Sequence, residues 1–223
     1  MRTIAWVTGR AAAGKSTLIA ACVTRLRSRG CEPLVLSDEE VLFQLKEADV
    51  EHRHHYHPYG DGRFLFRDGY LFDEGLRRIN VRLLDAITSG PSDIVLVELA
   101  RGAAATVADV SYRRALDLVH PQVWAQSLVF YLDVSYQVQV ERNHARVAEK
   151  RSVTPEQVMR DLYIRDDHES LTSAGITVHT VPAGCPAKET AAMILTLLGV
   201  GNHRNGIPSL YPDALRAAQG RGR

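Results

Sequence analysis

Residues 9 to 17 read Gly9-Arg10-Ala11-Ala12-Ala13-Gly14-Lys15-Ser16-Thr17 and match the pattern G-x-x-x-x-G-K-[ST]. An apolar run from Ile4 to Thr8 precedes this stretch and a helix-like segment from Lys15 to Ser28 follows it, so we expect a strand, a loop and a helix. Glycines let backbone N–H groups turn inward around phosphates, the lysine reaches the β- and γ-phosphates, and the hydroxyl binds Mg²⁺. The helix N-terminus favours the same anions. The stretch therefore predicts a loop that binds a nucleoside triphosphate with magnesium.

The composition is that of an ordinary globular chain. Its 223 residues are 45% hydrophobic and 24% charged, which suits a single α/β domain. We expect this domain over residues 1–200 and a loosely held tail, rich in Gly, Pro and Arg, over residues 201–223. The formal charge of +1 arises from 27 basic and 26 acidic residues, so no overall field favours nucleic acid or a membrane. Anion binding is then expected to be local.

Several features favour a cytoplasmic protein without a membrane partner. The longest apolar runs, such as Ile94 to Val97, are far shorter than the roughly 20 residues that cross a bilayer. No signal peptide is recognised before the first expected strand. The three cysteines fit neither a disulfide framework nor the spacing of a zinc site. A homodimer remains open.

Short apolar runs alternate with helix-like segments, and this rhythm predicts a parallel sheet covered by helices. The five expected strands are Ile4 to Thr8, Pro33 to Ser37, Ile94 to Glu98, Leu128 to Asp133 and Ile176 to Val181. The expected helices are Lys15 to Ser28, Phe72 to Thr88, Ala103 to Val119, Tyr136 to Ala148, Pro155 to Leu171 and Lys188 to Leu198. Thr154 and Gln157 have the spacing of a capping box at the start of one of these helices.

Acidic side chains are expected beside the phosphate loop. Asp38 follows the second strand and Glu98 ends the third, and ligands of open α/β sheets bind at the carboxyl ends of strands. Arg101 lies just beyond Glu98, so Asp38 and Arg101 are candidates for substrate binding. Two local alternatives stay open: Ser37 or Asp38 as a helix N-cap, and an ion pair between Glu98 and Arg101.

Two arginines on one expected helix are candidates for phosphate binding. Arg142 and Arg146 are four residues apart and therefore share a helix face, and the planar guanidinium group binds phosphate oxygens in pairs. Arg160 and Arg165 lie on the next expected helix. The alternative for all four is a solvated basic face.

Taken together, the strands, the phosphate loop and the paired arginines resemble the nucleoside monophosphate kinase-like branch of P-loop kinases over residues 2–200. The resemblance implies a sheet of order 2-3-1-4-5, ATP as donor and in-line phosphoryl transfer. It implies that Glu98 acts on Mg²⁺ with Ser16, that Asp38 orients or deprotonates the acceptor, and that residues 136–171 form a LID whose Arg142 and Arg146 close over the triphosphate. It also implies that the loop with Pro182 and Gly184 packs on adenine. The chain lacks the Asp-Arg-Tyr and Glu-Arg-Ser motifs of related kinases, so the acceptor stays open, and it lacks the NKxD motif of GTPases.

The segment 49–82 is the least generic part of the chain and is expected to bind the acceptor. Asp61, Arg63 and Arg67 are candidate ligands, and the arginines permit an anionic acceptor. The segment also holds four closely spaced histidines, for which a metal site, contact with substrate and a solvated surface all remain open. These histidines are His52, His54, His55 and His57. Its aromatic residues are expected to pack, and Arg77 and Arg78 fit either an anion site or surface charge.

The combined prediction is a kinase that transfers the γ-phosphate of ATP to a small-molecule acceptor: a nucleotide, a nucleoside or a hydroxyl-bearing metabolite. Lys15, Asp38, Glu98, Arg142 and Arg146 are the expected catalytic residues. One alternative is a regulatory NTPase that signals by conformation, and another is a kinase for nucleic-acid ends or bases. The neutral net charge weakens the nucleic-acid alternative.

Overall fold

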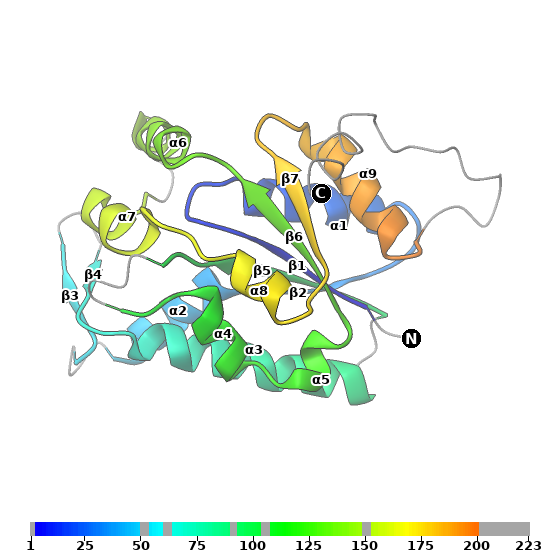
Figure 1. Cartoon of the computed structure of the whole chain (residues 1–223), viewed down its shortest axis with the longest axis horizontal. Helices are drawn as coiled ribbons and strands as arrows, with labels where there is room; N and C mark the ends of the chain where they lie inside the picture. The colour runs from blue at the N-terminus through cyan, green and yellow to red at the C-terminus, as the bar shows by residue number, and fades with distance from the viewer. Residues whose placement is uncertain are drawn as a thin grey trace.

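A five-stranded parallel sheet forms the centre of the molecule (Figure 1). The computed structural model describes residues 3–49, 54–59, 64–89, 93–103, 108–148 and 153–200. Its strands, in spatial order, are β2 (Leu34–Ser37), β5 (Ile94–Ala100), β1 (Thr3–Gly9), β6 (Ser127–Asp133) and β7 (Val178–Pro182). The predicted order 2-3-1-4-5 is confirmed, because β5, β6 and β7 are the third, fourth and fifth strands of this sheet along the chain.

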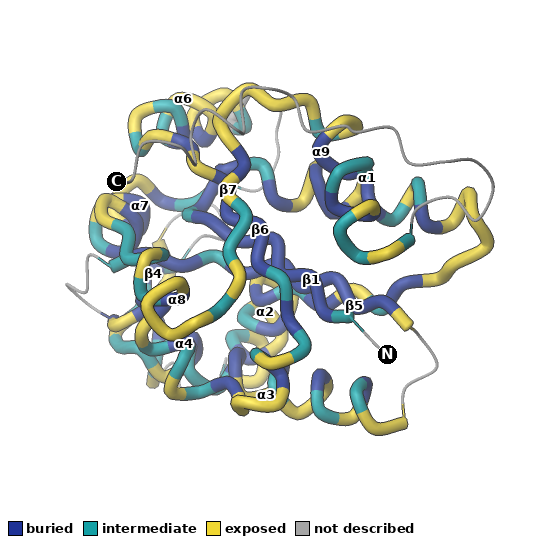
Figure 2. Tube along the Cα trace, turned by 45° about the vertical axis from the view of Figure 1, so that its right-hand side comes forward, coloured by how far each residue is buried: buried dark blue, intermediate teal, exposed yellow. Residues whose placement is uncertain are grey.

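Helices cover both faces of the sheet, and alternate strand residues supply the two halves of the core. Ala5 and Val7 of β1 pack with helices α1 (Lys15–Arg27) and α9 (Ala187–Leu197). Ile4 and Trp6 pack with the opposite layer. That layer holds α2 (Asp38–Ala48), α3 (Tyr70–Ser89), α4 (Tyr112–Leu118), α5 (Pro121–Trp124) and α8 (Glu169–Ser173). Figure 2 shows the central strands β1, β5 and β6 as the most continuously buried part of the chain. Within the described ranges, no helix is both long and apolar enough to cross a membrane.

The helix expected over Ala103 to Val119 is wrong in its first half. The observed helix α4 starts only at Tyr112, and the described residues before it, 108–110, are not helical. Ser111 caps the helix by accepting a hydrogen bond from the Arg114 N–H at 3.0 Å. The Asp167 carboxylate accepts two more, from the N–H groups of Tyr112 at 2.9 Å and Arg113 at 3.1 Å. These partners satisfy a helix start that the apolar pattern does not reveal.

The helix expected over Pro155 to Leu171 is two helices, α7 (Glu156–Tyr163) and α8. The chain leaves the helical path between them, where Asp166 accepts a hydrogen bond from the His168 N–H at 2.8 Å. The expected capping box does not form either. Asn143 of α6 (Tyr136–Ala148) binds the backbone of Thr154 instead, through its Oδ1 at 3.0 Å and its Nδ2 at 2.7 Å.

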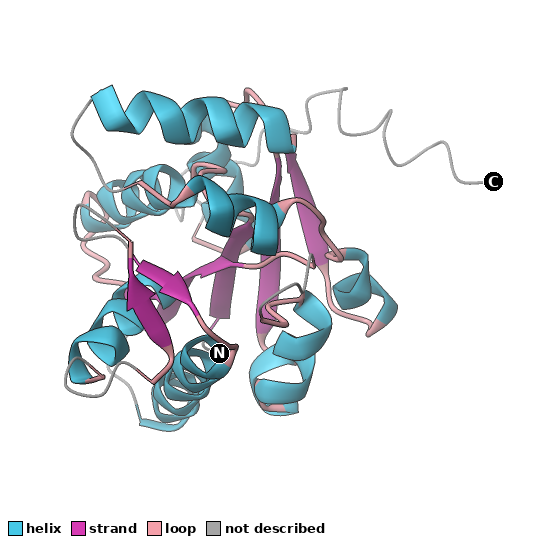
Figure 3. Cartoon of the chain, turned by 90° about the vertical axis from the view of Figure 1, so that its left-hand side faces the viewer, coloured by secondary structure: helices cyan, strands magenta, loops and turns pink. Residues whose placement is uncertain are grey.

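A small antiparallel hairpin lies apart from the main sheet (Figure 3). Its strands are β3 (Tyr56–Pro58) and β4 (Phe64–Phe66), inside the segment expected to bind the acceptor. Phe66 packs against Phe72 of α3 with ring centroids 4.3 Å apart, which confirms packing as the role of both rings. Tyr70 is 48% exposed, but it stacks on His55 at 4.1 Å. The hairpin is not predicted by the sequence pattern. Helix α2 is anticipated only by the N-cap alternative at Ser37 or Asp38: Ser37 is the N-cap residue, although its side chain makes no capping hydrogen bond.

Candidate active site

The phosphate loop has the backbone that its glycines predict. Gly9 adopts φ +147° and Gly14 adopts φ +105°, both in a region that side chains rarely allow. A Cβ atom at Gly9 would also lie 3.1 Å from the carbonyl oxygen of Leu132 in β6. Ala12 has a positive φ of 59°, and Ala11, Ala12 and Ala13 are buried. The loop is therefore shaped by these glycines and enclosed by the sheet, while Ser16 and Thr17 at its end are exposed.

The Lys15 side chain is folded into this loop. Only 6% of the residue is exposed, and its Nζ donates a hydrogen bond to the carbonyl oxygen of Arg10 at 3.0 Å. Burial lowers the pKa of Lys15, and the carboxylates of Glu98 and Asp38 oppose that shift. The lysine is thus held by a loop carbonyl near two acids, and its contact with phosphate stays a prediction.

Ser16 and Glu98 are paired across the site. The Ser16 hydroxyl donates a hydrogen bond to Oε1 of Glu98 at 2.8 Å. Burial raises the pKa of Glu98, and Lys15 and the Ser16 hydrogen bond oppose this. A hydroxyl and a carboxylate are hard oxygen donors, and a Mg²⁺ site on a nucleotide commonly takes one or two such protein ligands beside the phosphates. These two residues fit Mg²⁺.

A metal site was one alternative for the four histidines of the acceptor segment. Among the described residues, no three His, Cys, Asp or Glu side chains gather into a metal site, and His52 lies outside those residues.

Asp38 and Arg101 form a buried pair beside Lys15. Asp38 is the first residue of α2, and its Oδ2 accepts a hydrogen bond from the Ala100 N–H at 2.7 Å. The Arg101 Nη1 lies 3.6 Å from the same oxygen and also donates to the Ala100 carbonyl at 2.8 Å. Asp38 and Arg101 are 5% and 3% exposed. Burial raises the pKa of Asp38, whereas Arg101 and Lys15 lower it. Arg101 thus pairs with Asp38, whereas the alternative considered from sequence paired it with Glu98.

Sheet topology explains why these acids meet. Strand β2 pairs with β5 so that Ser37 lies opposite Glu98, and β5 pairs with β1 so that Glu98 lies opposite Val7. The residues after each strand therefore emerge at one edge, next to the phosphate loop. Asp38, Glu98 and Lys15 influence one another electrostatically at that edge.

The two predicted arginines of α6 face the same loop. Arg142 Nη1 donates a hydrogen bond to the Ala13 carbonyl at 3.0 Å, and the charge of Arg146 lowers the pKa of Lys15. Their shared helix face therefore lies towards the phosphate loop, although Arg142 itself is exposed. Arg165 is exposed, and only its backbone carbonyl meets this region, where it accepts from the Ala103 N–H at 2.9 Å.

The loop that follows β7 begins at the same edge of the sheet, since Pro182 at the end of β7 pairs with Asp133 at the end of β6. Gly184 has a φ of +86°, and the Cys185 N–H donates to the Pro182 carbonyl at 3.4 Å. Pro182 and Gly184 are exposed. Their contact with adenine stays a prediction.

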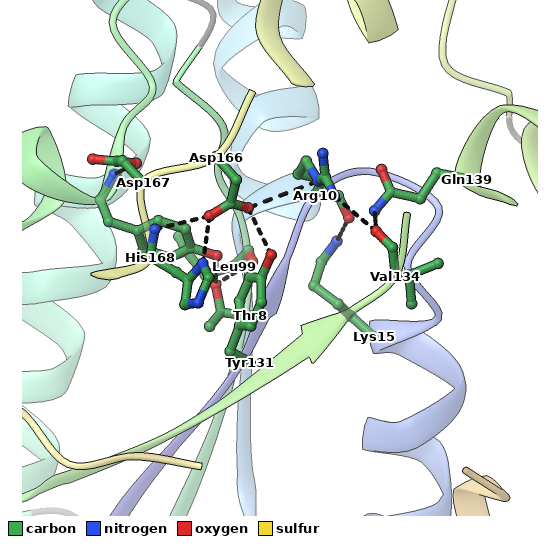
Figure 4. Close-up of polar contacts among 11 residues, drawn as sticks. Thr8, Arg10, Lys15, Leu99, Tyr131, Val134, Gln139, Asp166, Asp167 and His168 are labelled. Atoms are coloured by element: carbon green, nitrogen blue, oxygen red, sulfur yellow. Dashed lines mark hydrogen bonds and ion pairs between the residues drawn. The ribbon is translucent and has the colours of Figure 1, made fainter. Parts of the chain in front are cut away.

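A second polar cluster, which the sequence pattern does not reveal, centres on Asp166 (Figure 4). Its Oδ2 accepts a hydrogen bond from the Tyr131 hydroxyl at 3.0 Å and lies 3.8 Å from Nε of Arg10. Its Oδ1 lies 3.0 Å from Nδ1 of His168, which stacks on the Tyr131 ring at 3.8 Å. The hydrogen bond to Asp166 raises the pKa of His168. Arg10 also donates to the Val134 carbonyl at 2.8 Å. The Asp166 cluster therefore anchors the phosphate loop to the segment between α7 and α8.

In the segment expected to bind the acceptor, His55 has a structural role. Its Nδ1 lies 2.9 Å from the Asp68 carboxylate, and its N–H donates to Asp49 at 3.2 Å. His57 and Arg67 line a cavity of about 360 Å³ between the hairpin and α7. Asp61 and Arg63 lie outside the described residues.

Arg77 and Arg78 are surface charges. Arg78 bonds Glu74 at 3.1 Å, and Arg77 lies 3.8 Å from Asp73 and 3.9 Å from Glu74. Both arginines are exposed on α3, so the surface alternative is the one that the structure favours.

Comparison with known proteins gives a match in structure. No family model and no curated protein sequence matches the chain. The shikimate kinase of Acinetobacter baumannii, solved with shikimate, is 14% identical, with a TM-score of 0.53 over 92% of this chain and 97% of that one. The APS kinase CysC of Mycobacterium tuberculosis, solved with AMPPNP and APS, is 15% identical, with a TM-score of 0.52 over 89% of this chain and 98% of that one. This chain has the P-loop kinase fold. At such identity the likeness carries the fold alone, so the roles of individual residues rest on their geometry.

Proposed function

We propose that this chain is a phosphotransferase that moves the γ-phosphate of ATP onto a small-molecule acceptor. The observation that carries the proposal is the meeting of donor and acceptor groups at one sheet edge. The phosphate loop with buried Lys15 lies beside the Ser16–Glu98 pair and beside the Asp38–Arg101 pair. The Asp38–Arg101 pair supplies a second buried acid, beyond the Ser16–Glu98 pair, that can serve an acceptor. The two kinases with similar structures, one of them solved with AMPPNP, support ATP as donor.

In this proposal each side chain has a defined task. The loop amides and Lys15 bind the β- and γ-phosphates, and Arg142 and Arg146 neutralise charge that builds up on the transferred group. Ser16 and Glu98 would hold Mg²⁺, which when bound screens the phosphate charge. Asp38 accepts the proton of the acceptor hydroxyl as the oxygen of that hydroxyl bonds to the γ-phosphorus. The bond between the γ-phosphorus and the β,γ-bridging oxygen breaks at the same time, and ADP leaves. Burial raises the pKa of Asp38 toward the range of a useful general base.

We also place the chain in the nucleoside monophosphate kinase-like branch in the sense of its architecture. The sheet order and the basic face of α6 over the phosphate loop support this placement. The branch does not by itself define the acceptor, because the chain lacks the Asp-Arg-Tyr and Glu-Arg-Ser motifs of related kinases.

The test is acceptor dependence of ATP consumption. The full chain is incubated with ATP, Mg²⁺ and a panel of nucleosides, nucleotides, sugars and amino alcohols, and ADP release is followed. A kinase consumes ATP slowly until its acceptor is added, so one class of compound is expected to raise the rate at least about tenfold. Rapid ADP release that no acceptor increases would instead identify a regulatory NTPase.

A further inference from the structure

The cavity between the hairpin and α7 has the position expected of an acceptor site. Leu65 and Phe66 of β4 form one wall, and Val158 and Leu162 of α7 form the other. Val158 and Leu162 are four residues apart and therefore point to the same side of the helix. Its volume of about 360 Å³ is within the range of small-molecule pockets.

The residues that line this cavity pack towards the phosphate loop and the chain after Arg101. Leu65, Val158 and Leu162 belong to the same buried cluster as Ala11 of the phosphate loop. A Cβ atom at Gly102 would lie 2.2 Å from the carbonyl oxygen of Leu162, so α7 rests directly on the chain that follows Arg101. The next residue, Tyr163, is buried, and the charges of Asp38 and Arg101 act on its pKa, which burial raises. The helix that lines the cavity is thus in contact with the segment that holds the Asp38–Arg101 pair.

The charges of the lining do not suit a dianion. Among the described residues that line the cavity, Arg67 and Asp161 carry the formal charges, and these cancel. The Nε of Arg67 is already donated to the Tyr56 carbonyl at 3.2 Å. Cationic donors favour the binding of a phosphomonoester, whereas the nearby Asp161 carboxylate would repel it. His57 and Gln157 add polar groups that can hydrogen-bond to a hydroxyl.

We propose that the acceptor is a hydroxyl compound with an apolar body and no net negative charge, bound between β4 and α7 with its hydroxyl toward Asp38. The proposal rests on the phosphotransferase function above and gives its substrate class. It differs from the anionic acceptor that the arginines of the segment suggest by sequence alone. The four apolar side chains that line the cavity would bind the body of the molecule, while the polar groups would fix its orientation.

The experiment compares acceptor classes and then blocks the cavity. ADP release is measured with three probe sets: nucleoside monophosphates, simple sugars, and aryl or alkyl alcohols such as phenylalaninol and 3-phenyl-1-propanol. For the best acceptor of any set, KM is measured in Val158→Phe, which fills the cavity from α7. Because Val158 is buried, Gln157→Trp provides a second block from an exposed position that lines the same cavity. Val81→Phe, on an exposed residue of α3, is the matched control.

The expected result is turnover with the apolar alcohols. In both blocking variants the KM for the best alcohol should rise at least about tenfold, while the KM for ATP should change less than about twofold. The Val81→Phe control is expected to match the parent protein. Turnover with nucleoside monophosphates or sugars, or blocking variants whose acceptor KM is unchanged, would overturn the substrate class while leaving the kinase proposal standing. Acceptor-independent ADP release with all three sets would overturn the kinase proposal, and the substrate class with it.

Discussion

Replacing Gly102 with alanine tests how closely α7 is held against the catalytic edge. The added Cβ would lie 2.2 Å from the Leu162 carbonyl oxygen and 3.0 Å from the Tyr163 Cα, both backbone atoms that cannot rotate away. Either α7 or the chain after Arg101 must move. Overpacking of a buried contact costs about 1–3 kcal/mol, and we expect the upper end here because the clash is with backbone. In a domain of this size, about 3 kcal/mol lowers Tm by roughly 6–12 °C.

The assay is thermal unfolding by calorimetry, with Gly75→Ala as the matched control. Gly75 lies inside α3, where a Cβ would make ordinary contacts of 3.7–3.9 Å with Val41, Leu45 and Leu42. Alanine there is expected to stabilise the protein by about 0.4–1 kcal/mol, so the two substitutions should have opposite signs. Gly102→Ala should also lower kcat/KM, because the chain it displaces carries Arg101. A Gly102→Ala protein that unfolds within about 2 °C of the parent would refute the close contact of α7 with this edge.

Three further substitutions test individual roles. Asp38→Asn keeps an acceptor for the Ala100 N–H but removes the base, so kcat should fall about 10²–10⁴-fold with little change in the KM for ATP; an unchanged kcat would remove Asp38 from catalysis. Ser16→Ala removes one proposed magnesium ligand, and the Mg²⁺ concentration for half-maximal rate should rise about tenfold while ATP binding without Mg²⁺ stays the same. An unaltered Mg²⁺ requirement would contradict that assignment. The pKa of His168 is raised by Asp166 above the ordinary value of 6.5, so the pair stabilises the fold below about pH 6.5 and loses that effect as pH rises through the higher folded pKa. The unfolding free energy lost in His168→Asn should therefore shrink between pH 6 and pH 8 by chemical denaturation, and a pH-independent loss would contradict the ion pair.

The sequence predicts those parts of the molecule that depend on local pattern. The phosphate loop follows from residues that are adjacent in the chain, and the strands follow from short apolar runs. The meeting of Asp38 with Glu98 also follows, because parallel strands bring their carboxyl ends to one edge. The basic face of α6 is recognisable from the four-residue spacing of Arg142 and Arg146, although its contact with Ala13 needs the structure.

The errors occur where a distant residue decides the local backbone. Helix α4 starts at Tyr112 because Asp167, 55 residues away, binds its first N–H groups. Asp167 and its neighbour Asp166 lie where the expected single helix after Pro155 is interrupted. Asp166 accepts from the His168 N–H and Asp167 accepts from the Tyr112 N–H. Charge pattern alone permits an anionic acceptor at the arginines of the acceptor segment and leaves surface charge open for Arg77 and Arg78. The contacts of Arg67 with a carbonyl and of Arg78 with Glu74 are not visible to periodicity, and an anion site at Arg67 stays a prediction.

The transfer of phosphate to an acceptor is tested most directly by identifying the product with ³¹P NMR. ATP, Mg²⁺ and the acceptor that most increases ADP release are incubated with the parent protein and with Lys15→Ala. We predict a new phosphate ester that grows in step with ADP in the parent protein and does not form with Lys15→Ala. Inorganic phosphate in step with ADP, with no phosphorylated acceptor, would contradict it.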